Sequence, residues 1–104
     1  MCAVQFKTRM TITEFKDSLK QSTPPSNLSN TLQALWYDAK GDWETAHNVA
    51  QEINTREGSW IHAYLHRKEG DLGNASYWYR RANQPVSRKN LLDEWEEITQ
   101  ALLG

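Results

Sequence analysis

Residues 35–43 read Leu35-Trp36-Tyr37-Asp38-Ala39-Lys40-Gly41-Asp42-Trp43, and the pattern returns 29 residues later as Tyr64-Leu65-His66-Arg67-Lys68-Glu69-Gly70-Asp71-Leu72. Both copies carry a Gly-Asp pair. A glycine ends a helix in the left-handed conformation at little steric cost, and an aspartate after it can cap the next helix. Each copy therefore predicts a helix, a tight turn and a second helix, and a period in this range is typical of stacked repeats.

Apolar and small residues recur at helical spacing on both sides of each Gly-Asp pair. We expect the first helix of the second copy to begin near Ser59, after a turn at residues 55–58, and Ala39 to lie on a buried face. A capping-box pair, Thr11 and Glu14, predicts an N-terminal helix that ends before Pro24. The expected elements are a flexible tail at residues 1–9, the N-terminal helix, hairpin units at about 30–54 and 59–83, and a capping helix at about 88–103.

The predicted fold is all-α, with about six helices in a single domain over residues 10–104. Its five Trp and four Tyr predict a core of large rings packed against small residues. In the capping helix, an apolar stripe alternates with acids that we expect to be exposed. The stripe comprises Leu91, Trp95, Ile98 and Leu102, and the acids are Asp93, Glu94, Glu96 and Glu97.

Charge is unevenly distributed along the chain, although the formal net charge is only −1. Residues 59–90 are basic, whereas residues 91–104 hold four acids and no base. Such blocks can pair within the fold, and the net charge near zero argues against a nucleic-acid partner.

The single cysteine, Cys2, cannot form an intrachain disulfide, which fits a reducing compartment. No run approaches the roughly 18 apolar residues of a membrane span, and residues 1–20 lack the apolar stretch of a secretory signal. We therefore expect a cytoplasmic protein with no membrane partner.

The two units resemble the tetratricopeptide helix-turn-helix pattern over about residues 30–85. The matched pairs are Ala34 with Ala63, Gly41 with Gly70, Trp43 with Leu72 and Ala46 with Ala75, and the second unit adds Tyr79, Ala82 and Pro85. The spacing of 29 is shorter than the roughly 34 residues of that family. Residues 60–71 with 77–82 also resemble a family of small uncharacterised bacterial proteins, which implies no known activity.

The tetratricopeptide resemblance implies a concave groove lined by the first helix of each unit. It places Trp60, Tyr64, Arg67 and Lys68 there, and Trp78 and Arg81 share a flank of the next helix. Trp, Tyr and Arg are the residue types that most often anchor interfaces. The sequence thus predicts a non-catalytic module that binds a protein or peptide partner, or a homodimer that closes its own groove. The alternative is that Trp60 and Tyr64 only pack against the N-terminal helix.

His62 and His66 lie four residues apart, which places them on one helix face, and His47 lies on the preceding helix. Together they form the alternative prediction of a metal-binding or catalytic protein; packing of one histidine inside the hairpin is the structural explanation. Ala63 occupies the position where a zincin has its glutamate, so metalloprotease chemistry is not indicated. The sequence also lacks a serine elbow and a phosphate loop, so we expect neither an enzyme nor a cofactor.

Overall fold

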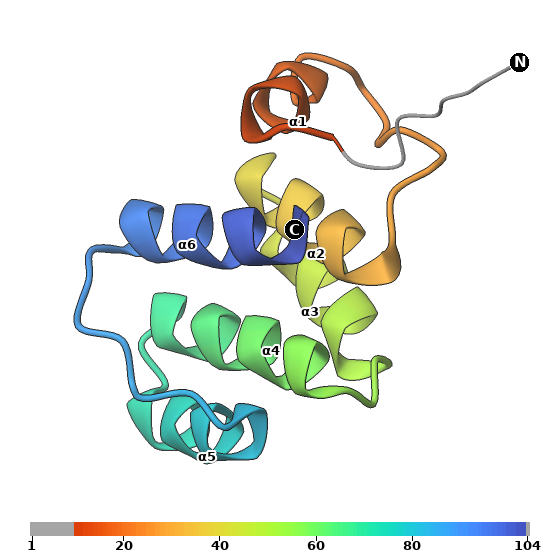
Figure 1. Cartoon of the computed structure of the whole chain (residues 1–104). Coiled ribbons are helices and arrows are strands. Elements are labelled where there is room, and N and C mark those ends of the chain that lie inside the picture. Colours follow the sequence, from red (N-terminus) through yellow and green to blue (C-terminus); the bar gives the residue numbers. More distant parts are fainter. Residues whose placement is uncertain (1–9, 104) are drawn as a thin grey trace, which may run out of the picture.

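A computed structural model describes residues 10–103, so the predicted tail at residues 1–9 lies outside the described part. Six α-helices and no strand occur in residues 10–103, which confirms the all-α prediction (Figure 1). The helices are α1 (Ile12–Ser18), α2 (Asn30–Ala39), α3 (Trp43–Gln51), α4 (Arg56–Lys68), α5 (Leu72–Ala82) and α6 (Leu91–Leu103). None of these helices combines the length and apolar character needed to cross a membrane.

The two Gly-Asp turns have the same hydrogen-bonded geometry. Gly41 and Gly70 adopt left-handed φ values of 86° and 92°. The amide of Asp42 donates to the Tyr37 carbonyl at 2.9 Å, and the amide of Asp71 donates to the His66 carbonyl at 2.9 Å. Each aspartate then accepts from an amide three residues on and so caps the next helix. Both predicted hairpins, α2 with α3 and α4 with α5, are therefore formed by the same local chemistry.

Helix α6 packs across α2 and α4 and completes the core (Figure 1). Trp95 of α6 is buried, and its indole nitrogen donates to the Leu35 carbonyl of α2 at 3.0 Å. Phe15 of α1 is fully buried and lies 5.9 Å from the Trp95 ring. The outer helices thus supply the burial that two isolated hairpins lack.

Helix α4 begins at Arg56, three residues earlier than expected, because the Thr55 hydroxyl accepts from the Gly58 amide and caps it. Gly58 had the sequence signature of a turn, yet it lies inside the helix. A Cβ added there would lie 2.4 Å from the Ile53 carbonyl oxygen and 2.7 Å from the Ile53 Cβ. Gly58 therefore lets the chain after α3 pass close against α4.

Replacing Gly58 with alanine is expected to lower the free energy of unfolding by about 2 kcal/mol, because the new methyl group overpacks the contact with Ile53. Gly73 is the matched control, since it is also helical and nothing lies within 4 Å of its added Cβ. Gly73→Ala is expected to stabilise the protein by about 0.5–1 kcal/mol. Urea unfolding of both variants measures the difference; equal stability of the two would contradict the close contact.

Helix α6, expected from about residue 88, begins at Leu91, because the Asn90 side chain accepts from the Asp93 amide at 2.8 Å and caps the helix. Two expectations about burial are corrected. Ala39 is exposed, since it is the last residue of α2 and lines an open pocket beside α6. Glu94, expected on the exposed face of α6, is only 1% exposed because it forms internal polar contacts.

Candidate functional site

The three histidines of the chain meet between α3 and α4. His62 and His66 lie one turn apart on α4, and their rings are 4.8 Å apart. His47 of α3 faces both, with its Nε2 3.0 Å from the Nε2 of His62 and its ring centroid 5.1 Å from that of His66. One ring nitrogen from each histidine lies within 4.8 Å of the others. The structure thus brings all three sequence candidates together.

Two tryptophans hold these rings in place. Trp43 stacks on His47 at 4.9 Å with an interplanar angle of 11°, and its indole nitrogen donates to the Leu65 carbonyl at 2.8 Å. Trp78 of α5 stacks on His62 at 4.0 Å. Ala46 and Ala50 are both buried and mark the side of α3 that faces the protein interior. The histidines therefore lie in an aromatic pocket built by three helices, and their ring orientations are fixed before any ligand binds.

Hydrogen bonding fixes which nitrogen of His66 faces the cluster. Its Nδ1 lies 2.8 Å from Glu69 Oε2. A carboxylate on one ring nitrogen keeps the proton there and leaves Nε2 with a free lone pair, which is the arrangement of metal-bound histidines in proteins. Between His47 and His62, one Nε2 carries a proton and the other accepts it, so this contact is a hydrogen bond that a metal ion would replace.

The cluster favours neutral imidazoles. Burial, together with the smaller effects of the neighbouring His47 and His66, lowers the pKa of His62 from 6.5 to about 4. Burial likewise lowers the pKa of His47, followed by the effect of His66. A neutral imidazole has the lone pair that a metal ion requires. At neutral pH both side chains are therefore ready to bind a cation without first losing a proton.

The metal-free protein is expected to lose about 2 kcal/mol of its free energy of unfolding through His62 between pH 7 and pH 5. The pKa of His62 is depressed in the folded state, so the unfolded state binds more protons in this range. The stabilisation is complete above about pH 6.5 and disappears as the pH approaches 4.

Denaturant unfolding in the presence of a chelator, on the wild type and on His62→Phe, measures this pH dependence. Phenylalanine keeps an aromatic ring against Trp78 but cannot titrate. The difference between the two proteins isolates His62 from the carboxylates, which also titrate at acid pH. Parallel pH profiles for the two proteins would contradict the depressed pKa.

The six residues predicted to bind a partner are divided among separate surfaces. Tyr64 and Lys68 line one pocket, Trp78 and Arg81 line a second, and Trp60 lines two others. Arg67 instead binds Glu94 at 2.7 Å and the Lys89 carbonyl. Helix α6 packs against α2 and α4, the first helices of the two units, which the resemblance assigns to the groove. Trp95 of α6 donates to the Leu35 carbonyl of α2.

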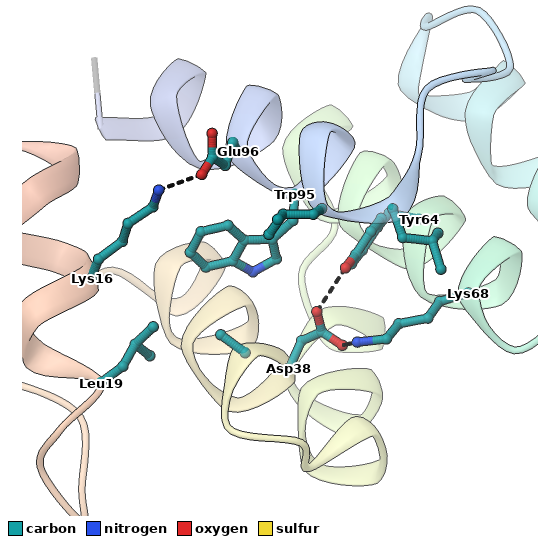
Figure 2. A pocket seen from close by; sticks show the side chains of 10 residues that line it. Lys16, Leu19, Asp38, Tyr64, Lys68, Trp95 and Glu96 are labelled. Atoms are coloured by element: carbon teal, nitrogen blue, oxygen red, sulfur yellow. Dashed lines mark hydrogen bonds and ion pairs between the residues drawn. The ribbon is translucent and has the colours of Figure 1, made fainter.

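The pocket that includes Tyr64 and Lys68 has a volume of about 510 Å³ and lies between α1, α2, α4 and α6 (Figure 2). Asp38 lies at its base, where it accepts from the Tyr64 hydroxyl at 2.9 Å and from Lys68 Nζ at 2.8 Å. Lys16 of α1 pairs with Glu96 of α6 at its rim. Apolar side chains form the rest of the lining: Leu19, Ala39, Leu91, Leu92 and Trp95.

A buried polar network lies on the other side of α6. Glu94 accepts from Arg67 on one oxygen and from the Tyr79 hydroxyl on the other. Burial raises the pKa of Tyr79 well above its usual value, and the hydrogen bond to Glu94 adds to this, so the tyrosine remains a donor. The Arg67–Glu94 pair, and the Lys89–Glu97 pair at 3.2 Å, each join a base of residues 59–90 to an acid of residues 91–104. The two charge blocks therefore pair within the fold.

Comparison of the chain with protein-family models, with curated proteins and with solved structures gave no match.

Proposed function

We propose that this protein binds a divalent transition-metal ion through the Nε2 atoms of His47, His62 and His66. The observation that carries the proposal is the convergence of three buried or half-buried imidazoles on one point. Ligands at about 2.0–2.1 Å in a tetrahedral site lie about 3.3 Å from one another. The 3.0 Å between the nitrogens of His47 and His62 is close to that spacing, and a ring nitrogen of His66 lies within 4.8 Å of both histidines.

The ligand set supports a metal of the zinc type. Imidazole nitrogens suit Zn²⁺, Cu²⁺, Ni²⁺ and Fe²⁺, whereas Mg²⁺ and Ca²⁺ prefer oxygen. Three protein ligands leave a fourth position, which is the ligand count of catalytic rather than structural zinc sites. Glu69 supports the assignment because it orients His66 from behind. A bound ion would also join α3 of the first hairpin to α4 of the second.

Equilibrium dialysis of the protein, purified without a histidine tag, against buffered Zn²⁺ tests the proposal by metal analysis. One zinc per chain is expected, together with an at least tenfold loss of affinity in each of the variants His47→Gln, His62→Gln and His66→Gln. Cys2→Ala is the control, because it removes the only thiol and leaves the histidines intact. Affinities that are equal in the histidine variants and the wild type would refute the site and leave a purely structural His47–His62 hydrogen bond.

We also propose a second function, docking of a partner protein at the pocket beside Trp95. Its support is Leu92, which is 65% exposed at the edge of the apolar lining although such a residue gains from burial. Tyr64 and Lys68, two residues of the predicted interaction surface, share this pocket. The proposed occupant is an apolar side chain of a partner, because the charged groups around the pocket are already paired with one another.

Affinity purification with matched baits tests this docking site. Leu92→Lys places a charge at the pocket, and Leu72→Lys places the same charge on an equally exposed leucine of α5. A genuine partner is expected to be lost with the first bait and retained with the second. Partners that are retained by both baits would contradict docking at this pocket.

A further inference from the structure

A second pocket adjoins the histidine cluster and has a different character from the one beside Trp95. It has a volume of about 360 Å³ and is lined by His62 and Trp78 together with residues of the α3–α4 connection. Its lining includes two guanidinium groups, those of Arg56 and Arg81, and no acidic side chain. Two cations without a counter-charge make this pocket electropositive, unlike the pocket beside Trp95, where each lysine has a carboxylate partner.

Arg81 is held in a defined position. Its guanidinium lies 5.4 Å from the Trp78 ring and 5.9 Å from the Tyr77 ring, and one of its nitrogens donates to the Tyr77 hydroxyl at 3.2 Å. No carboxylate of residues 10–103 forms an ion pair with Arg81 or Arg56. Stacking on aromatic rings orients a guanidinium without consuming its hydrogen-bond donors. Donors on both arginines therefore remain for a ligand.

We propose that this pocket binds a small oxyanion, a carboxylate or a phosphate, beside the metal-bearing His62. The inference rests on the proposed metal site, because the ion held by His62 would add positive charge at one wall of a pocket that already has two arginines. Guanidinium groups match carboxylate and phosphate oxygens with paired hydrogen bonds. The volume suits a small molecule, and Ser59 and Thr55 add hydroxyl groups to the lining.

The two sites are then energetically coupled. A cation near an anion stabilises it, and reciprocity requires that the anion tighten metal binding by the same factor. Trp78 contributes to both sites, since it stacks on His62 and lies beneath Arg81. Its substitution is therefore expected to weaken both metal and anion binding.

Isothermal titration of zinc-loaded, gel-filtered protein with inorganic phosphate, and separately with acetate, tests the inference. At least one of the two anions is expected to bind, and the tighter one identifies the class of ligand. Its dissociation constant is expected to rise about tenfold in Arg81→Gln, from the loss of a charge-assisted hydrogen bond, and again about tenfold in metal-free protein. Arg80→Gln is the matched control, because Arg80 is exposed and lies outside the pocket.

The outcomes separate this inference from the proposed function. Zinc binding with no detectable binding of either anion, or with equal effects of Arg81→Gln and Arg80→Gln, overturns the oxyanion site and leaves the metal site intact. Anion binding that is the same with and without zinc overturns the coupling. Absence of zinc from the dialysed protein, read from metal analysis before any titration, overturns both.

Discussion

Replacing Glu94 with leucine is expected to lower the free energy of unfolding by about 3–5 kcal/mol, the cost of breaking a buried ion pair by removing one partner. Glu94 is 1% exposed and accepts from both Arg67 and Tyr79. Without it, the guanidinium of Arg67, whose side chain is 17% exposed, loses its carboxylate, and the tyrosine hydroxyl loses its acceptor. Urea unfolding of the two proteins measures the difference.

Glu97→Leu is the matched control, because Glu97 lies on the same helix but pairs with Lys89 at the surface, where both side chains are about half exposed. Glu97→Leu is expected to lower the free energy of unfolding by less than about 1 kcal/mol. A triple variant that replaces all three partners, Arg67→Met, Tyr79→Phe and Glu94→Leu, is expected to recover most of the lost stability. Equal losses for Glu94→Leu and Glu97→Leu would contradict the burial of Glu94.

Zinc at a thousandfold excess over its dissociation constant is expected to raise the free energy of unfolding by about 4 kcal/mol. The ligands lie on two helices of different hairpins, so the unfolded chain lacks the preformed site and the ion binds mainly to the folded state. For a domain of this size the melting temperature is expected to rise by more than about 10 °C. Thermal unfolding followed by circular dichroism measures the rise.

Two controls define the origin of that stabilisation. Mg²⁺ at the same concentration is expected to have no effect, because it prefers oxygen ligands. His62→Gln with zinc is expected to melt close to its own metal-free temperature. A zinc-induced rise in His62→Gln equal to that of the wild type would place the ion elsewhere on the chain.

Most of the fold could be predicted from the sequence because its signals are local. The Gly-Asp pairs end one helix and cap the next within two residues, and Thr11 with Glu14 forms the predicted capping box. Gly58 could not be assigned in this way. Its role depends on Ile53 passing close against the helix, a tertiary contact that overrides the usual meaning of a glycine in a turn.

The buried acids were missed for a different reason. A glutamate is typical of the solvent-exposed face of a helix. Glu94, however, lies three residues after Leu91 and four before Ile98, within the apolar stripe of α6. That position in the stripe was the sequence signal for the burial of Glu94. Asp38 likewise lies three residues after Leu35 on the buried side of α2. Which base would neutralise each acid depends on how the helices pack, and the sequence alone does not supply this.

The histidine cluster could be predicted from the sequence only in part. The spacing of His62 and His66 predicts a shared helix face, and the short connection between α3 and α4 brings His47 near them. The stacking of Trp43 on His47 follows from their spacing of four residues on α3, whereas the stacking of Trp78 on His62 depends on how α5 packs against α4. This aromatic frame packs around the three histidines and holds them close together inside a small domain.

X-ray absorption at the zinc edge, recorded on protein loaded with one equivalent of zinc, tests the metal site most directly. We predict three imidazole nitrogens at about 2.0–2.1 Å with a fourth light ligand in the wild type, and two imidazoles in His62→Gln. A first shell of oxygen atoms without imidazole scattering, or an identical spectrum for His62→Gln, would contradict this prediction.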